Sequence, residues 1–431
     1  MKWLKRLGVA IAVLAVALVL WLFVGNDVAN RRLIAVEKAW SEAPGSLDDF
    51  PKRHPAVATN EAARRLESAA EALDVDLRPR FRSKSEDSKR SRSAAETAKA
   101  VSAYLDASFA DPDGAASPPS GEAEAVLAKM APGLVPIAEL LSKEKPVWLE
   151  EIGRGYEAPI PNLLGQLRLQ RILLASALRL SSRGDPRGAE ALLDASWTLN
   201  GSLVTRPELI SQLIAIAVGR MEAGVLRKVP VEPGRWIPRL SARDARKGLV
   251  EAFTAEAWVF RDAVLRGALL DPDGTARSRR PRLLEFLSEP YLKVQAASLL
   301  GTLREFVRES KAAPITGLTS ESRDETAESP GGFSDVMSRL MLPNMENARL
   351  RADRAAVDLD LTRKVLELRA ARGTAKEWPA TVPGMETSVV KDARWVYTRT
   401  PDGRATIELS RRLDWGNTFG LVLPSRWVSP N

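Results

Sequence analysis

Residues 162–199 read NLLGQLRLQRILLASALRLSSRGDPRGAEALLDASWTL, and this stretch predicts a helical hairpin. Asn162 is a favoured N-cap residue, and leucines recur after it at helical spacing. Gly184-Asp185-Pro186 supplies a glycine for the end of one helix, a cap for the next and a proline for its first turn. The second helix carries an apolar stripe of Ala189, Leu192, Leu193, Ser196 and Leu199. We therefore expect two helices that pack against each other across a tight turn.

Helix signals continue on both sides of this hairpin. Thr205-Arg206-Pro207-Glu208 resembles a capping box and predicts a third helix through Leu226, antiparallel to the second. Further helix starts are expected at Thr59 or Asn60, at Ser93, at Ser241 with Asp244, at Pro290 and at about Met345, the last helix ending at Arg372 before Gly373. The fold class is therefore mainly α, built from antiparallel helical hairpins.

The apolar period changes from helical to alternating after Pro383. Two short runs predict strands, with Thr400-Pro401-Asp402-Gly403 as the turn between them. The inward positions are Ala393, Trp395 and Tyr397 in the first run and Ala405, Ile407 and Leu409 in the second. Because an isolated hairpin is marginal in water, we expect a third strand from Phe419, Leu421 and Leu423. The chain should end in a small antiparallel β element.

The N-terminal segment is the most apolar part of the chain. Residues 7–24 read LGVAIAVLAVALVLWLFV without a charge, which as a helix reaches about 27 Å and nearly matches the hydrocarbon of a bilayer. We expect an uncleaved transmembrane helix, continued as a helical stalk to Pro44-Gly45; a cleaved signal peptide is the alternative. The basic residues before the run favour a cytoplasmic N-terminus, so the expected location is the inner membrane with the bulk of the chain in the periplasm.

These signals divide the chain into five expected parts. They are a membrane anchor over 1–25, a stalk and first helices with a basic loop over 26–110, a helical core over 121–310, a flexible linker over 311–332, and a long helix with a β-hairpin or sheet over 333–431.

Composition excludes several classes of chemistry. The 431 residues include no cysteine and a single histidine, His54, so disulfides, thiolate catalysis and Cys/His zinc sites are excluded or nearly so. His54 lies between Arg53 and Pro55, where we expect a solvated loop. Two Ser-x-x-Lys patterns, Ser142 to Lys145 and Ser388 to Lys391, have the spacing of a Ser-Lys pair, but the second falls on an expected strand, where an odd offset separates the side chains.

Carboxylate pairs are the other catalytic option. The pairs are Asp358 with Asp360, Glu150 with Glu151, and Asp271 with Asp273. Asp271-Pro272-Asp273-Gly274 and Asp111-Pro112-Asp113-Gly114 are favoured turn sequences, so a backbone role outweighs a calcium or acid-base role. We therefore assign no catalytic, cofactor-binding or metal-ligating residue, and we expect no cofactor.

The surface charge and the tryptophans suggest partners only in general terms. The basic loops Arg78–Arg92 and Arg277–Arg282 suit contact with anionic lipid or an acidic envelope polymer, or are simply solvated. Nucleic acid is not expected, because aromatic residues are not interleaved with these charges. Trp395 is expected in the core, and Trp415 and Trp427 less firmly so.

Several short motifs carry a resemblance. The anchor, Asn60-Glu61-Ala62-Ala63, Pro159-Ile160-Pro161-Asn162-Leu163-Leu164, Gly184-Asp185 and Arg206-Pro207-Glu208-Leu209-Ile210 together resemble a family of uncharacterised, single-pass bacterial envelope proteins. This resemblance implies a location and an architecture, without an activity. The segment around Gly184 and Ala189 is similar to one tetratricopeptide-type helix pair, which implies protein binding.

The C-terminal segment has a second resemblance. The long helix, Gly373, Trp378-Pro379 and Trp395-Val396-Tyr397 are similar to the tail of type II secretion pseudopilins. Residues 1–24 lack the processed pilin leader, and Asp414-Trp415-Gly416-Asn417 does not reproduce the acidic calcium loop of those tails.

The functional prediction is a membrane-anchored binding or scaffolding protein of the cell envelope. Residues 7–24 would contact the bilayer, and the helical middle third would contact an envelope protein. The alternatives are a tethered enzyme that acts on an envelope polymer with carboxylates or a Ser-Lys pair, and a pseudopilin-like assembly factor. A pocket with converging buried carboxylates or a buried lysine would favour the enzyme, whereas a sheet packed on the helix that ends at Gly373 would favour the assembly factor.

Overall fold

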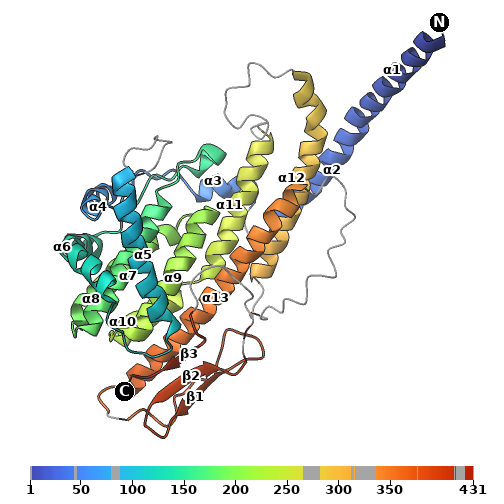
Figure 1. Ribbon diagram of the computed structural model, residues 1–431. Coiled ribbons are helices and arrows are strands. Elements are labelled where there is room, and N and C mark those ends of the chain that lie inside the picture. Colours follow the sequence, from blue (N-terminus) through green and yellow to red (C-terminus); the bar gives the residue numbers. More distant parts are fainter. Residues whose placement is uncertain are drawn as a thin grey trace.

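The computed structural model describes residues 2–42, 46–78, 88–265, 282–311, 315, 336–375, 377–411, 413 and 423–430 (Figure 1). Most of these residues are helical, and the described strands form a single small antiparallel sheet, as the sequence predicts. Figure 1 shows the first helix projecting from the body, with the sheet and the C-terminus at the opposite end.

A long N-terminal arm leads into the body. It consists of α1 (Lys2–Leu20), a π-helical turn η1 (Trp21–Gly25) and α2 (Asn26–Ser41), which follow one another without a break in helical backbone geometry. Apolar side chains of the first part, including Val9, Val13 and Phe23, are exposed. The predicted stalk is indeed a helix, but α2 packs along α12 (Arg282–Lys311) instead of standing free, and it buries Leu33 and Trp40.

The next elements along the chain include four α-helices and two short 3-10 helices. They are η2 (Leu47–Asp49), α3 (Phe50–Arg53), α4 (Glu61–Glu71), α5 (Ser88–Ala110), α6 (Gly121–Lys143) and η3 (Ile152–Glu157). Asn60 caps α4 as predicted, because its Oδ1 accepts from the Ala63 N–H at 2.9 Å. Ser93 was the wrong start for α5: the helix already begins at Ser88, since no glycine or proline interrupts residues 88–93. Of the predicted basic loop Arg78–Arg92, residues 79–87 lie outside the described residues, and residues 88–92 belong to α5.

The predicted hairpin is confirmed in α7 (Leu163–Ser182) and α8 (Pro186–Val204). Asn162 and Asp185 each cap their helix through Oδ1, at 3.0 Å from the Gly165 N–H and 2.9 Å from the Gly188 N–H. Gly184 has φ +79°, a left-handed conformation that glycine adopts without strain.

The third helix differs from its predicted start. Helix α9 (Leu209–Lys228) begins after Glu208, whose side chain makes no cap bond and pairs with Arg206 instead. Thr205 is the C-cap of α8. The capping-box prediction was wrong because a residue before proline disfavours helical geometry, so Arg206 cannot begin the helix ahead of Pro207.

Four helices complete the body: α10 (Pro233–Ala242), α11 (Ala245–Leu265), α12 and α13 (Val336–Arg372). Ser241 lies in the last turn of α10 and starts nothing; Asp244 caps α11 by accepting from the Arg246 and Lys247 N–H groups. Pro290 lies inside α12, since one lost backbone bond does not end a helix that is packed along its length.

The last helix is longer than predicted but ends where expected. Helix α13 begins at Val336, ahead of the predicted Met345, and ends at Arg372, with Gly373 at φ +51°. The expected linker over 311–332 lies mostly outside the described residues.

The sheet joins β1 (Trp395–Arg399), β2 (Ala405–Leu409) and β3 (Arg426–Val428) in that order. The predicted hairpin is confirmed, with Trp395 opposite Leu409. The predicted third strand was placed too early: β3 pairs Trp427 with Ile407, Leu423 precedes it, and Phe419 and Leu421 lie outside the described residues. Tight packing makes Trp395 and Trp427 core residues, whereas Trp415 is not among those described.

The sheet packs on α13. Val357, Leu361 and Val365 of the helix share an apolar cluster with Trp395 and Trp427. The sheet therefore packs on the helix that ends at Gly373, which is the arrangement that a pseudopilin-like assembly factor requires. Helix α13 also packs against α9, α10, α11 and α12, so it is a central helix of the body rather than the core of a separate tail.

Helix α9 carries charged residues into the centre of the body. Arg220 and Arg227 both pair with Asp358 of α13, at 2.7 and 3.4 Å, and all three are buried. Arg369 of α13 donates to the carbonyl oxygens of Leu226 and Val229, at 3.0 and 2.9 Å, and so satisfies the C-terminus of α9. Burial lowers the pKa of Arg369 to about 10.

By length and composition, α6 and α9 are the helices that pass as possible membrane spans among the residues described well enough to test. This is weak evidence for membrane association, because a buried helix of a soluble body passes the same test. Helix α9 is mostly buried among α7, α8, α11 and α13, and α6 packs on α4, α5, α7 and α8. Only residues 7–24 were predicted as a span from the sequence, because charged residues interrupt the apolar runs of α6 and α9.

Candidate functional site at the junction of the arm and the body

The arm is fixed to the body near the end of α2. The Trp40 indole donates its Nε1–H to the Leu300 carbonyl of α12 at 3.1 Å, and the ring is buried in the same cluster as Phe253 and Leu303. At the other end of α2, the Lys293 ammonium of α12 donates to the Asn26 Oδ1 at 3.0 Å. Both ends of α2 are therefore tied to α12.

An arginine of α11 joins the arm to the segment that follows it. The Arg261 guanidinium contacts Glu37 of α2 and, at 2.7 Å, the Asp48 carboxylate of η2. Although burial opposes its charge, these two carboxylates raise the pKa of Arg261 above its ordinary value. One cation thus holds α2 and η2 at a set distance from α11.

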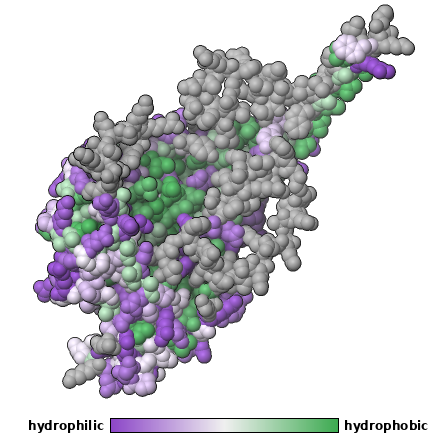
Figure 2. Space-filling view, viewed as in Figure 1, coloured by the Kyte–Doolittle hydropathy of each residue, from purple (hydrophilic) through white to green (hydrophobic). Residues whose placement is uncertain are grey.

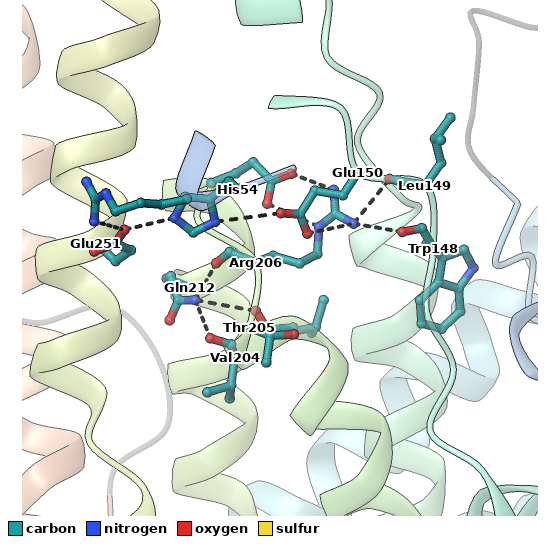
Figure 3. A network of polar contacts seen from close by, with 12 residues as sticks. His54, Trp148, Leu149, Glu150, Val204, Thr205, Arg206, Gln212 and Glu251 are labelled. Atoms are coloured by element: carbon teal, nitrogen blue, oxygen red, sulfur yellow. Dashed lines mark hydrogen bonds and ion pairs between the residues drawn. The ribbon is translucent and has the colours of Figure 1, made fainter. Parts of the chain in front are cut away.

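His54 lies at the centre of a polar network at this junction (Figure 3). Its Nε2 is 2.8 Å from Glu251 of α11, and its Nδ1 is 3.9 Å from Glu150. The ring packs on Phe50, with 4.6 Å between centroids, and only 16% of the side chain is exposed. The prediction of a solvated loop was wrong, because both carboxylates come from parts of the chain far from His54 in sequence.

Arg206 holds the other half of the network. It is buried between α8 and α9, pairs with Glu208, and donates to the carbonyl oxygen of Leu149 at 3.2 Å. The segment that contains Leu149 also pairs with the chain beside His54, since the Val57 and Glu150 backbones exchange two hydrogen bonds of 2.9 Å. Figure 3 shows these contacts converging from α8, α9, α11 and the two loops.

The two glutamates on His54 differ in acidity. The hydrogen bond from His54 lowers the pKa of Glu251, and the charges of Arg53 and His54 act in the same direction. Burial raises the pKa of Glu150, and the charge of Arg206 only partly opposes this. The His54 Nε2 is within hydrogen-bond distance of Glu251, whereas the 3.9 Å between its Nδ1 and Glu150 is too long for a hydrogen bond.

The charged groups of this network are paired with one another, so the network holds parts of the chain together. Glu251 pairs with Arg53 and His54, and Glu208 pairs with Arg206. Glu150 lies 3.9 Å from both Arg206 and His54, so these carboxylates are held by cations of the protein. In the described part of the chain, no group of three or more His, Cys, Asp or Glu side chains is arranged to hold a metal ion. The network therefore links the loop after the arm to the body.

The two Ser-Lys patterns do not form pairs. The Ser142 hydroxyl donates to the Glu139 carbonyl at 2.8 Å, whereas the Lys145 ammonium lies 3.4 Å from the Thr205 hydroxyl. Burial lowers the pKa of Lys145. Ser388 accepts a bond from the Val390 N–H, and both Ser388 and Lys391 precede β1, so their placement on a strand was wrong.

The remaining carboxylate candidates have structural partners. Asp358 pairs with arginines of α9, while Asp360 accepts from the Trp395 indole at 2.8 Å. Glu151 pairs with Arg154. Within Asp111–Gly114 the Asp113 N–H donates to the Asp111 Oδ1 at 2.9 Å, but the Gly114 N–H donates to the Val428 carbonyl at 2.7 Å, so the segment pairs with β3 instead of closing a hydrogen-bonded β-turn. Asp271, Asp273 and residues 277–281 of the second basic loop lie outside the described residues, and Arg282 begins α12.

Two buried lysines donate hydrogen bonds to backbone carbonyl oxygens within the fold. The Lys228 ammonium donates to the carbonyl oxygens of Asp113 and Ala115, and burial lowers its pKa. The cavity beside it has a volume of about 10 Å³, room for no more than a water molecule. Lys364 donates to the Gly384 carbonyl at 2.7 Å.

Comparisons of the chain with protein-family models, curated proteins and solved structures found no match. The resemblances to envelope proteins, pseudopilin tails and a tetratricopeptide-type pair therefore stay predictions from the sequence.

Proposed function

We propose that this chain is a membrane-tethered binding or scaffolding protein of the cell envelope, with residues 7–24 in the bilayer. The observation that carries the proposal is the continuity of the apolar arm with α2, together with the attachment of α2 to the body through Trp40, Lys293 and Arg261. A tether of this kind fixes the orientation of the body as well as its distance from the membrane.

The exposed apolar surface of α1 supports the membrane part of the proposal. Val9, Val13, Val16 and Val19 are each more than half exposed, although such side chains gain free energy when they leave water. A bilayer is an apolar environment of suitable thickness for this helix. The basic residues Lys2, Lys5 and Arg6 favour a cytoplasmic N-terminus, with the body on the periplasmic side of the inner membrane.

The partner surface is proposed at one end of the helical middle third. The start of α7, the end of α8 and the start of α9 share an apolar cluster of Leu163, Leu203 and Ala215. Ile160, Leu164 and Ile210, which are close to these helix ends in the sequence, are exposed, and Figure 2 shows a hydrophobic area on the body. An envelope protein with an apolar helix suits such a surface, because apolar anchors contribute most where they leave water.

The membrane part is tested with the full chain and with Val13→Asp combined with Val16→Asp. We expect the wild type to float with liposomes and to resist alkaline extraction, and the double variant to lose both properties, because charges in the centre of a span are costly. Ile34→Asp on exposed α2 is the control and should float like the wild type. A polypeptide that begins near Asp27 and stays soluble would contradict the tether.

The partner part is tested by photo-crosslinking in intact cells. A crosslinker at Leu164 should give a discrete adduct, and one at the exposed Lys129 of α6 should not. Ile210→Glu should reduce the adduct from Leu164. Identical adducts from both positions, or none from Leu164, would argue against a binding surface there.

A further inference from the structure

A cavity of about 380 Å³ lies where the corner between α10 and α11 meets α13. It is separate from the His54 network and from the exposed end of α7. Its wall combines charged residues, Arg243, Asp244, Asp360 and Arg363, with apolar ones such as Leu359 and Ile315. Its volume falls within the range of small-molecule sites, about 300–1,000 Å³.

The carboxylates of the wall are engaged within the protein. Both oxygens of Asp360 accept hydrogen bonds, Oδ1 from Arg363 and Oδ2 from the Trp395 indole and the Val389 N–H. Asp244 accepts through Oδ1 from two N–H groups at the start of α11. The wall therefore has little acceptor capacity left for a ligand.

Hydrogen-bond donors in the wall are more plentiful than acceptors. Each guanidinium carries five N–H groups. Arg243 is nine-tenths buried, pairs with Glu222 and lies over the Trp197 ring at 3.5 Å, which fixes its position. Arg363 donates one Nη2–H to Asp360, while its Nε is buried with no hydrogen-bond partner and lies 3.6 Å from Glu367. This N–H has an ion-pair partner in Glu367 but makes no hydrogen bond, so an acceptor on a ligand would be favourable here.

The rest of the wall is apolar. Leu240, Ile315, Ala356, Leu359 and Val389 contribute side chains without polar atoms. A bare inorganic anion would leave this part of the cavity unfilled, whereas a molecule with an apolar portion would displace water from it.

From this arrangement we propose that the cavity binds a small organic anion, with a carboxylate or phosphate monoester facing Arg363 and Arg243 and an apolar portion against Leu359 and Ile315. Guanidinium groups bind both kinds of anion through charge-assisted hydrogen bonds. The inference does not rest on the membrane tether, and it adds a ligand class to the binding role proposed above.

The probes are phenylacetate, phenyl phosphate, phenethylamine and inorganic phosphate, titrated calorimetrically into the full chain in nanodiscs, with empty nanodiscs as the reference. We expect at least one aromatic anion to bind, phenethylamine not to bind, and inorganic phosphate to bind at least about tenfold more weakly. The preference between phenylacetate and phenyl phosphate distinguishes a carboxylate ligand from a phosphate ligand. Failure of both aromatic anions to bind, or equal binding of phenethylamine, would overturn the proposal.

Two variants locate the site. Arg363→Gln should weaken binding of the aromatic anion about tenfold, since the Trp395 and Val389 donors still satisfy Asp360. Ala356→Phe keeps every charge but fills the cavity, and it should abolish binding. Arg351→Gln, on the same helix but away from the cavity, is the matched control and should bind like the wild type. Wild-type binding in both test variants, with unchanged circular dichroism, would place the ligand elsewhere and overturn the inference.

Discussion

Helices α1 and α9 have similar lengths, 19 and 20 residues, and both are rich in apolar residues, yet their surroundings in the structure differ. The valines of α1 are exposed, whereas α9 is enclosed by α7, α8, α11 and α13. Helix α9 carries Arg220, Glu222 and Arg227, and each has a partner of opposite charge or a hydrogen-bonding acceptor inside the body. Residues 7–20 of α1 carry no charge.

The difference teaches that a high content of apolar residues does not by itself separate a core helix from a helix that could enter a membrane. A buried helix can carry charges when neighbouring helices supply partners, because paired charges avoid most of the cost of leaving water. A helix surrounded by lipid has no such partners, so its sequence excludes charges. The uncharged stretch over residues 7–20 is therefore what distinguishes α1 from α9, and it fits the membrane position proposed above.

The sharpest test of this comparison is the same change in both helices. Val218→Asp in α9 places an unpaired carboxylate in a fully buried position, and we expect a loss of about 5 kcal/mol of unfolding free energy. Val16→Asp in α1 should change the unfolding free energy of the body by less than about 0.5 kcal/mol. Denaturant unfolding of the full chain in detergent measures both. Similar losses in the two variants would mean that α1 also packs on the body.

The matched charges of α9 are tested next. Asp358→Ala leaves Arg220 and Arg227 buried without their carboxylate, and we expect it to destabilise the fold by about 4 kcal/mol. The half-exposed pair of Arg426 and Glu408 provides the control, since Glu408→Ala should cost less than about 0.5 kcal/mol. If Asp358→Ala costs no more than the control, matched charge is not what keeps α9 in the core.

The attachment of the arm should have a smaller effect. Trp40→Ala removes a buried indole and its bond to Leu300, with an expected cost of about 3 kcal/mol and faster amide exchange along α2. Ile34→Ala on the exposed side of the same helix should cost less than about 0.5 kcal/mol. Unchanged amide exchange in Trp40→Ala would show that the other contacts suffice.

The smallest expected effect is a pH dependence at the junction. The pKa of Glu251 is lowered in the folded state, so its stabilising contribution is present above its unfolded pKa of about 4.5 and is lost as the pH falls through the folded value. Glu251→Gln should therefore lose less stability than the wild type on acidification below about pH 4.5. The difference should stay under about 1 kcal/mol, because the pair is partly solvated.

The contribution of Glu150 to stability should depend on pH in the opposite direction. Its raised pKa imposes a cost at neutral pH that disappears as the pH falls toward about 4.5. Glu150→Gln should remove this gain on acidification. Chemical denaturation between pH 3 and 7 measures both variants, and parallel curves for both variants and the wild type would contradict these assignments.

Much of the fold could be predicted because its signals are local. Asn162, Gly184 and Asp185 act within one or two helical turns of their own backbone, and their roles are confirmed. The failures are also local in origin. Thr205 looked like a cap, but Pro207 prevents a helix from starting there; Ser93 looked like a cap, but the helix had already begun.

The candidate site could not be predicted in the same way. His54 and Glu251 are 197 residues apart in sequence, and Arg206 reaches a loop near residue 149. No spacing rule connects such positions, because the packing of α8, α9 and α11 brings them together. The cavity near Arg363 depends in the same way on α10, α11 and α13 meeting at one corner.

The cap that Arg369 places on α9 has a consequence for biosynthesis. This arginine follows Leu226 by 143 residues, so α9 leaves the ribosome long before the side chain that completes it. The nascent chain must keep the open end of α9 solvated, or covered by a chaperone, until α13 has been translated. A premature stop codon after residue 311 but ahead of residue 369 would therefore leave the centre of the body unfinished, even though every helix up to α12 had been made.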